Sequence, residues 1–222
     1  MKLRNLIATV SKTLVIFLIP IILFSTNFLL LVSPRYIEWE YSKEDFPSTE
    51  ELTTRERSIL SRSVLAYVKG ITDVSTLDGT DLFTEKEINH LNDIKTLHNT
   101  IFLVRGVAFI LFIYLILFSI LSAKNRYSII KCIFSGSLII LIAAVFLFAM
   151  VYFNFNSIFI SIHKIFFAQE SWVFDSQNIL IELYPKEFWI DSAIVFLIFT
   201  LIESLIICAA SFETTKRFKR KS

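Results

Sequence analysis

Glycine, proline and cysteine are scarce in this chain of 222 residues, with four, four and two copies. So few glycines and prolines leave little room for disordered or low-complexity segments. The two cysteines, Cys132 and Cys208, form no C-x-x-C pair, which argues against a disulfide framework and a thiol-based zinc site. Both lie in or beside long apolar runs, so we expect them to be buried packing residues.

Motifs for covalent or metal catalysis are also missing. The sequence has no G-x-S-x-G, and no motif surrounds Ser157 or Ser161. His90 and His98 are about 12 Å apart along a helix, too far to share one ion. A site built from His90, Asp93 and His163 stays open but matches no metal motif. We therefore predict no metal, no cofactor and no nucleic-acid partner.

Apolar residues are what the chain has in abundance. Hydrophobic residues make up 55% of it, aromatic residues 15%, and the mean hydropathy is +0.64, too apolar for an ordinary soluble domain. A spanning helix needs about 20 mostly apolar residues. Four stretches qualify: Leu14–Val32, Ile101–Leu121, Cys132–Phe153 and Ile190–Ala210. The first is too long for the apolar region of a signal peptide and has no cleavage motif, so we interpret it as an uncleaved anchor.

Charge predicts the orientation, because short loops rich in Lys and Arg stay in the cytoplasm. The N-terminus, the short loop after residue 121 and the tail hold eleven basic residues and one acid, Glu213. The long segments Ser33–Thr100 and Asn154–Trp189 hold ten basic and seventeen acidic residues. We expect a multi-pass protein of the cell membrane with both termini cytoplasmic and both long segments outside. An alternative interpretation is that the basic tail binds anionic lipid.

These signals predict an all-α integral membrane protein with four transmembrane helices and an extracellular helical cap. The expected parts are the N-terminus with the first span (1–32), the first cap segment (33–100), spans two and three (101–153), the second cap segment (154–189), and the fourth span with the tail (190–222).

The first cap segment shows two helix starts. Thr53 with Glu56, and Thr84 with Glu87, each have the spacing of a capping box. Gly70 is a plausible end of the first helix. The second helix runs without a break signal into span two, so His90 should lie close above the membrane surface.

The second cap segment carries an aromatic stripe at helical spacing, formed by Phe155, Ile158, Phe159, Ile162 and Phe166. His163 lies at its edge. Asp175 and Ser176 indicate a turn and a helix start, and Pro185 can open the last span. His90 and His163 therefore converge on one layer, where they suit proton transfer near neutral pH on a lipid-like substrate. The alternative is that they are amphipathic interface residues, as we expect of His98.

The E-x-x-H-x-x-D-x-K run from Glu87 to Lys95, and the segment 159–193 with its H-x-x-F-F and P-x-x-F elements, resemble the bacterial lipoprotein intramolecular transacylases. The resemblance implies transfer of the sn-2 acyl chain of a diacylglyceryl lipoprotein to the α-amine of its N-terminal cysteine, with His90 and His163 as the catalytic pair. Residues around Asn92 and 168–170 depart from the family pattern, so no role is assigned to them.

Within that hypothesis, Asp93 is expected to orient His90. The expected pocket wall is Phe159, Phe166, Phe167 and Trp172, and the expected partners are diacylglyceryl lipoproteins and membrane lipid. Two other hypotheses remain open: a non-catalytic four-span adaptor and a metal-dependent membrane hydrolase.

Overall fold

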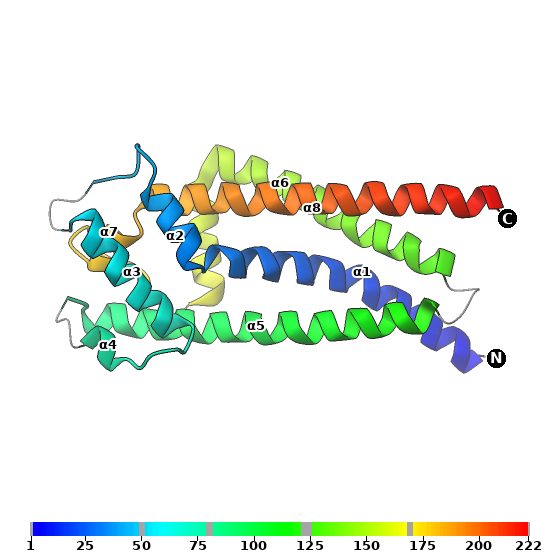
Figure 1. The fold of residues 1–222 in the computed structure, drawn as a ribbon, viewed down its shortest axis with the longest axis horizontal. Coiled ribbons are helices and arrows are strands. Elements are labelled where there is room, and N and C mark those ends of the chain that lie inside the picture. The colour runs from blue at the N-terminus through cyan, green and yellow to red at the C-terminus, as the bar shows by residue number, and fades with distance from the viewer. Residues whose placement is uncertain (1, 49–51, 79–81, 121–125, 168–170, 222) are drawn as a thin grey trace. The chain divides into compact units, whose positions relative to one another are not determined.

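The computed structural model describes residues 2–48, 52–78, 82–120, 126–167 and 171–221, and every regular element in these ranges is a helix. The elements in chain order are α1 (Lys2–Leu31), α2 (Pro34–Tyr41), α3 (Thr54–Val68), α4 (Ser75–Asp78), α5 (Glu85–Ile120), α6 (Arg126–Phe166), α7 (Ile179–Leu183) and α8 (Lys186–Lys221) (Figure 1). This confirms the predicted all-α class.

Four of these helices, α1, α5, α6 and α8, are long and apolar enough to cross a membrane, which confirms the number of spans. Their most apolar windows bury only 11–28% of their residues inside the protein. Most apolar side chains of the spans therefore face outward, as expected when lipid is the surrounding solvent. A continuous helix also satisfies its own backbone donors and acceptors, which hydrocarbon cannot do.

The chain divides into two compact units. The first, here the span unit, comprises residues 1–27, 103–149 and 196–222. Its core gathers around Val15 on α1, Ala108 and Leu115 on α5, and Cys132 on α6. Cys132 and Cys208 are both buried and free, which confirms the packing role predicted for them. Both chain ends lie at the same end of this unit (Figure 1).

The second, here the short-helix unit, comprises residues 28–102 and 150–195. It contains α2, α3, α4 and α7 and the adjoining ends of the long helices. Its main core has the composition of an ordinary water-soluble core, in which apolar side chains of α3, α4, α5 and α7 pack together. The buried members are Leu60, Val64, Tyr67, Val68, Leu77, Phe83, Leu91, Ile179, Leu180 and Leu183.

The two predicted capping boxes are present. Thr53 and Glu56 exchange hydrogen bonds at the start of α3, and Thr84 and Glu87 do so at the start of α5. Gly70 follows the end of α3 with a φ of +70°, a conformation that glycine adopts without steric cost.

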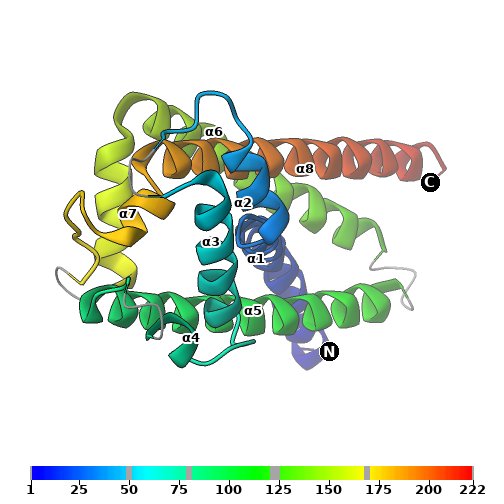
Figure 2. The same cartoon turned by 60° about the vertical axis from the view of Figure 1, so that its left-hand side comes forward.

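Three local features differ from the sequence prediction. Helix α2, capped by Ser33, was not expected. The turn expected at Asp175 is present and is closed by Asn178, but the helix start expected at Asp175 or Ser176 lies further along the chain, at Ile179, where α7 begins. Helix α6 continues beyond the apolar span but is broken at Asn154, whose φ of −154° and ψ of 67° are not helical. The chain changes direction there (Figure 2).

Candidate active site

His90 lies in the second turn of α5. Residues 85–100 of this helix include five charged side chains and precede the apolar run that starts at Ile101. His90 is eleven residues, about 16 Å, from that run. Its side chain is 6% exposed and contacts the rings of Phe167 and Phe174, with centroids 4.8 and 5.4 Å away.

His163 lies in the part of α6 that follows the kink at Asn154. Its Nδ1 is 2.8 Å from the carbonyl oxygen of Phe159. Because a carbonyl can only accept, Nδ1 carries a proton and donates it. In the neutral ring, the other nitrogen, Nε2, then has a free lone pair. The aromatic rings of Phe159, Trp172 and Phe167 surround the imidazole, at centroid distances of 4.0, 4.8 and 5.4 Å.

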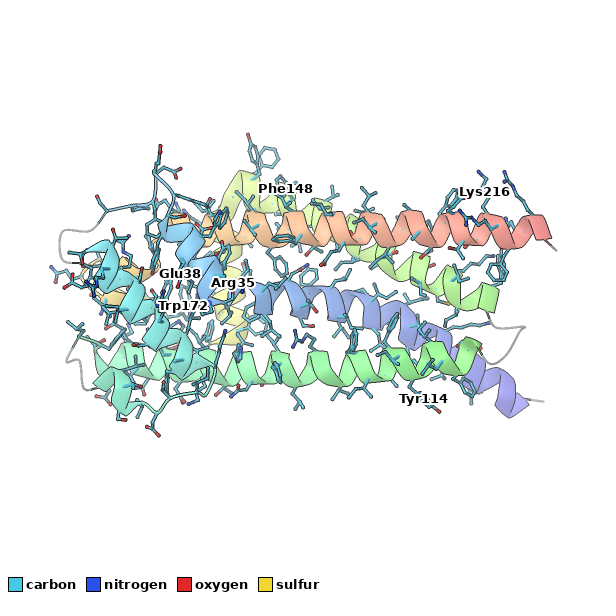
Figure 3. All side chains as sticks on the ribbon, in the orientation of Figure 1. Arg35, Glu38, Tyr114, Phe148, Trp172 and Lys216 are labelled. Atoms are coloured by element: carbon cyan, nitrogen blue, oxygen red, sulfur yellow. The ribbon has the colours of Figure 1, made fainter. Side chains whose placement is uncertain are left out.

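The two imidazole rings lie nearly parallel, with centroids 6.4 Å apart and an interplanar angle of 24°. Phe167 touches both of them. The ring of Trp172, a residue labelled in Figure 3, touches that of His163. We call this group the histidine cluster: His90, His163, Phe159, Phe167, Trp172 and Phe174. All six residues belong to the short-helix unit.

Burial sets the charge of the histidine cluster. Desolvation, with a smaller contribution from the neighbouring His163, lowers the pKa of His90 to about 4. Desolvation also lowers the pKa of His163, and the hydrogen bond to Phe159 opposes that change. Both rings are therefore largely neutral at pH 7, and each is able to accept a proton.

A buried nitrogen of His90 lacks a hydrogen-bond partner among the described residues. His90 Nδ1 is buried and makes no hydrogen bond within the part of the chain that the structure describes. A buried polar atom without a partner costs free energy, so natural proteins keep few of them, often at functional sites. In this structure the surrounding side chains cover the nitrogen, so a bound molecule would reach it only after they move.

Two of the predicted site residues are not brought to the cluster. Asp93 makes no hydrogen bond to His90 among the described residues, because the ring turns toward Phe167 and Phe174 instead. The predicted orienting bond is therefore absent. Phe166 is 54% exposed and makes no ring contact with either histidine in the described ranges. Phe167, four residues after His163, takes the inward position.

His98 stands apart from the cluster. It is 8% exposed, and its Nδ1 lies 3.3 Å from the side-chain oxygen of Asn99. Its ring is thus buried within the protein, and the expectation that it is an amphipathic interface residue stays a prediction. Within the residues that the structure describes, no three His, Cys, Asp or Glu side chains gather as a group able to hold a metal ion.

Sequence reasoning missed Phe174. This residue lies in an irregular segment where no helical or strand period predicts which side chains point inward. The two aromatic residues Trp172 and Phe174 alternate with Val173, which is exposed. This alternation was the signal that could have indicated that both aromatic side chains point to the same side. Lys86 fixes the segment by donating to the Val173 carbonyl at 2.5 Å.

Fold and site together define a polytopic membrane protein with two neutral histidines enclosed by aromatic rings. The sequence matches the family model for the lipoprotein intramolecular transacylase Lit over residues 12–189. The chain belongs to this family, and membership implies that it is a transacylase enzyme that acts on lipoproteins.

The chain is also similar to a curated relative and to solved structures. An uncharacterized protein from Aquifex aeolicus (strain VF5) is 25% identical over 200 residues, which cover 85% of this chain and 87% of the relative. The solved structure of the membrane integral lipoprotein intramolecular transacylase Lit from Bacillus cereus superimposes with a TM-score of 0.83 at 22% identity, covering 98% of this chain and 100% of that one. A variant of that protein with one histidine replaced by alanine gives 0.76 at 21% identity, covering 100% and 99%. At this identity, the likeness shows the fold.

Proposed function

We propose that the protein moves the sn-2 acyl chain of a diacylglyceryl lipoprotein onto the α-amine of that lipoprotein's N-terminal cysteine, leaving a lyso-form lipoprotein. His90 and His163 act as the catalytic pair. The observation that carries the proposal is the histidine cluster, in which two neutral imidazoles from distant parts of the chain lie 6.4 Å apart among aromatic rings.

The reaction needs a proton acceptor before anything else. A free α-amine has a pKa of about 7.7–8.0, so most of it is protonated and not nucleophilic at pH 7. Removal of one proton allows its nitrogen to attack the ester carbon. The N–C bond forms and the C–O bond to the glyceryl oxygen breaks. Of the two protons that the ammonium group loses on the way to the amide, one ends on that oxygen and the other passes to the surrounding water.

His163 is suited to carry this proton. Its Nδ1–H is fixed on the Phe159 carbonyl, which leaves Nε2 as the acceptor. The same hydrogen bond stabilises the imidazolium that forms, because Nδ1 remains a donor to a carbonyl oxygen. In the proposed sequence, His163 Nε2 takes the proton from the amine and returns it to the departing sn-2 oxygen.

His90 is suited to stabilise negative charge on the substrate. Its low pKa keeps the ring neutral, and one of its nitrogens carries hydrogen in either tautomer. In the proposed mechanism this N–H donates to the oxygen that becomes negative when the amine attacks. Such donors are worth more where water is excluded.

The aromatic residues of the cluster have a separate role in the proposal. Amine and ester belong to one molecule, so no enzyme nucleophile is required, and folding the substrate into a reactive ring is the main task. Holding reacting groups in the right geometry contributes up to about 7–11 kcal/mol to a lowered barrier. Phe159, Phe167, Trp172 and Phe174 are suited to confine the substrate and to exclude the water that would hydrolyse the ester.

The proposal also sets the orientation of the protein in the membrane. The excess of basic residues in the N-terminus, the short loop and the tail supports an orientation with the short-helix unit outside and both termini in the cytoplasm. Lipoproteins carry their lipid on the outer face of the membrane, so the site would meet its substrate there. We propose further that the reaction uses no metal and no cofactor, so that chelators leave its rate unchanged.

Mass spectrometry of a lipoprotein N-terminus tests the reaction. The protein is expressed in cells that lack this activity. Transfer within one molecule is an isomerisation, so the modified N-terminus should keep its mass, while fragmentation reveals an N-acyl group and a monoacylglyceryl group. An unchanged free amine in expressing cells would contradict the proposal.

Isotopic labels test whether the transfer is intramolecular. Lipoproteins with heavy peptide and heavy acyl chains are mixed with fully light ones, and each product should keep its own label. Products that combine heavy and light parts would indicate an acyl-enzyme or transfer between substrates, and would refute the intramolecular route.

A further inference from the structure

Glu87 is a fully buried carboxylate on α5, one turn before His90. Its Oε2 accepts hydrogen bonds from the backbone N–H of Thr84, as in a capping box, and from the Thr84 hydroxyl, both at 2.8 Å. Its Oε1 accepts a third hydrogen bond, at 2.9 Å, from the backbone N–H of Leu180. Capping α5 explains only the first oxygen, so the contact with Leu180 points to a second role.

Leu180 is the second residue of α7, and the first N–H groups of a helix have no partner inside that helix. Glu87 therefore fixes the start of α7 on α5. The turn just before α7 is closed by two hydrogen bonds between Asp175 and Asn178, at 2.8 and 3.0 Å. The position of α7 consequently determines the position of the segment that comprises this turn and the four residues before it.

That segment, residues 171–178, carries two rings of the histidine cluster. Trp172 lies 4.8 Å from His163, and Phe174 lies 5.4 Å from His90. Lys86 holds the same segment from the side: its Nζ donates to the Val173 carbonyl and lies 5.4 Å from the centre of the Phe174 ring. Two consecutive residues of α5 therefore attach the segment to the helix that bears His90.

We propose that Glu87 is a positioning residue for the acyl transfer: by holding α7 and residues 171–178 on α5, it keeps Trp172 and Phe174 against the two histidines and keeps water from the ester. The inference rests on the proposed function and deepens it.

The substrate amine and water compete as nucleophiles for the ester carbon. The position of residues 171–178 determines which of them attacks. Attack by the amine gives the N-acyl product, with the proton passing from nitrogen to the glyceryl oxygen. Attack by water breaks the same C–O bond but releases a fatty acid and leaves the amine unmodified. A loosened segment 171–178 should therefore change the ratio of the two products, which a general loss of folded protein would not do.

The substitution Glu87→Gln is suited to this test because it preserves size. Both carboxylate oxygens accept from N–H or O–H donors, so the amide group of Gln places its NH₂ against one of those donors. Thr84→Ala is the matched control. It removes the hydroxyl partner of the same carboxylate but leaves the hydrogen bond to Leu180 intact.

The experiment uses the full chain in vesicles of phosphatidylethanolamine and phosphatidylglycerol with a synthetic S-diacylglyceryl-cysteinyl peptide. Mass spectrometry measures the ratio of released fatty acid to N-acyl peptide. We expect Glu87→Gln to raise this ratio about tenfold or more, and Thr84→Ala to change it less than about threefold, since small displacements of reacting groups have large effects on rate. An unchanged ratio in Glu87→Gln, or equal ratios in both variants, would overturn the proposal.

A spectroscopic measurement tests the positioning without activity. In a Trp39→Phe/Trp189→Phe background, Trp172 is the only tryptophan. Its emission should shift to longer wavelength with Glu87→Gln, as the ring meets water, and should not shift with Thr84→Ala. An unchanged emission in Glu87→Gln would overturn the positioning role. If the wild type makes no N-acyl product at all, the proposed function fails, while this measurement still decides the role of Glu87.

Lys86→Met provides a variant that does not depend on a buried side chain. Lys86 is exposed, so its replacement should leave folding intact while removing the hydrogen bond to Val173. We expect the fatty-acid ratio to rise about threefold. If Glu87→Gln does not accumulate, an unchanged ratio in Lys86→Met contradicts the proposal.

Discussion

The two units of the molecule have different interiors. In the span unit, the helices leave most of their apolar surface outside the protein. Alongside a small apolar cluster, they also meet at small and polar residues. Gly136 on α6 lies against the backbone of Ile16 on α1. Asn27 on α1 donates hydrogen bonds to Thr200 and Glu203 on α8, at 3.0 and 2.9 Å. Such contacts associate helices where lipid tails remove the hydrophobic driving force.

The short-helix unit instead has a compact apolar core, which includes Leu77 and Leu183 with no exposed surface. It also buries carboxylates, which is costly unless each one is paired. Glu40 is bonded by Lys43 and Tyr36, and Glu87 accepts three hydrogen bonds. The comparison teaches that the short-helix unit, with its buried and hydrogen-bonded carboxylates, is better equipped to hold catalytic groups in place than the more apolar span unit.

The largest expected difference concerns the side of the membrane from which each end of the chain can be labelled. A cysteine at Ser75, in a background without Cys132 and Cys208, should react with an impermeant thiol reagent in intact cells, because Ser75 is exposed in the unit expected outside. A cysteine at Thr214, in the basic tail, should react only after lysis. The reverse pattern would place the histidine cluster on the cytoplasmic side and contradict the proposed function.

Removing apolar side chains should separate the two kinds of interior. Leu77→Ala in the short-helix unit should lower the free energy of unfolding by about 2–5 kcal/mol, because it leaves a cavity in a closed core. Ile110→Ala on α5, where the side chain is 71% exposed, should cost less than about 1 kcal/mol. Thermal unfolding of both variants checks the difference, and equal losses would mean that the distinction between the interiors is wrong.

Two glycines allow a test of how closely the helices of the span unit pack. A Cβ at Gly136 would lie 2.6 Å from the carbonyl oxygen of Ile16, whereas a Cβ at Gly106 would meet nothing within 4 Å. We expect Gly136→Ala to destabilise the protein by about 1–3 kcal/mol. Gly106→Ala should be neutral or slightly stabilising, because glycine is a poor helix former. Melting temperatures that fall equally in both would show that the close approach of α1 and α6 does not matter for stability.

The pH dependence of stability should originate in the short-helix unit. The pKa of His90 is about 4 in the folded chain and about 6.5 when unfolded, so the unfolded chain binds more protons between these values. Stability is therefore retained above pH 6.5 and lost as the pH falls toward 4, by about 1–2 kcal/mol at pH 5. His90→Phe keeps an aromatic ring and should reduce this loss in melting experiments. An unchanged pH profile would show that His90 is not buried as a neutral ring.

The sequence predicted the span unit better than the short-helix unit, for a physical reason. A span is specified locally, since about 20 apolar residues suffice, and the capping boxes at Thr53 and Thr84 are local as well. The histidine cluster depends on contacts between distant segments. Asp93 was expected near His90 from helical spacing, yet the ring turns to Phe174, which lies in an irregular segment. The contact of Glu87 with Leu180 has no local signal at all.

The central claim is that His90 and His163 form one catalytic pair, and single-turnover rates of N-acyl product formation test it most directly. With the full chain in vesicles and a diacylglyceryl-cysteinyl peptide, His90→Ala and His163→Ala should each lower the rate by about 10²–10⁴-fold. His98→Ala changes a buried histidine of the same unit that lies outside the cluster. The folded fraction of this variant should keep most of the wild-type rate. Rates equal to wild type in both His90→Ala and His163→Ala would contradict the account.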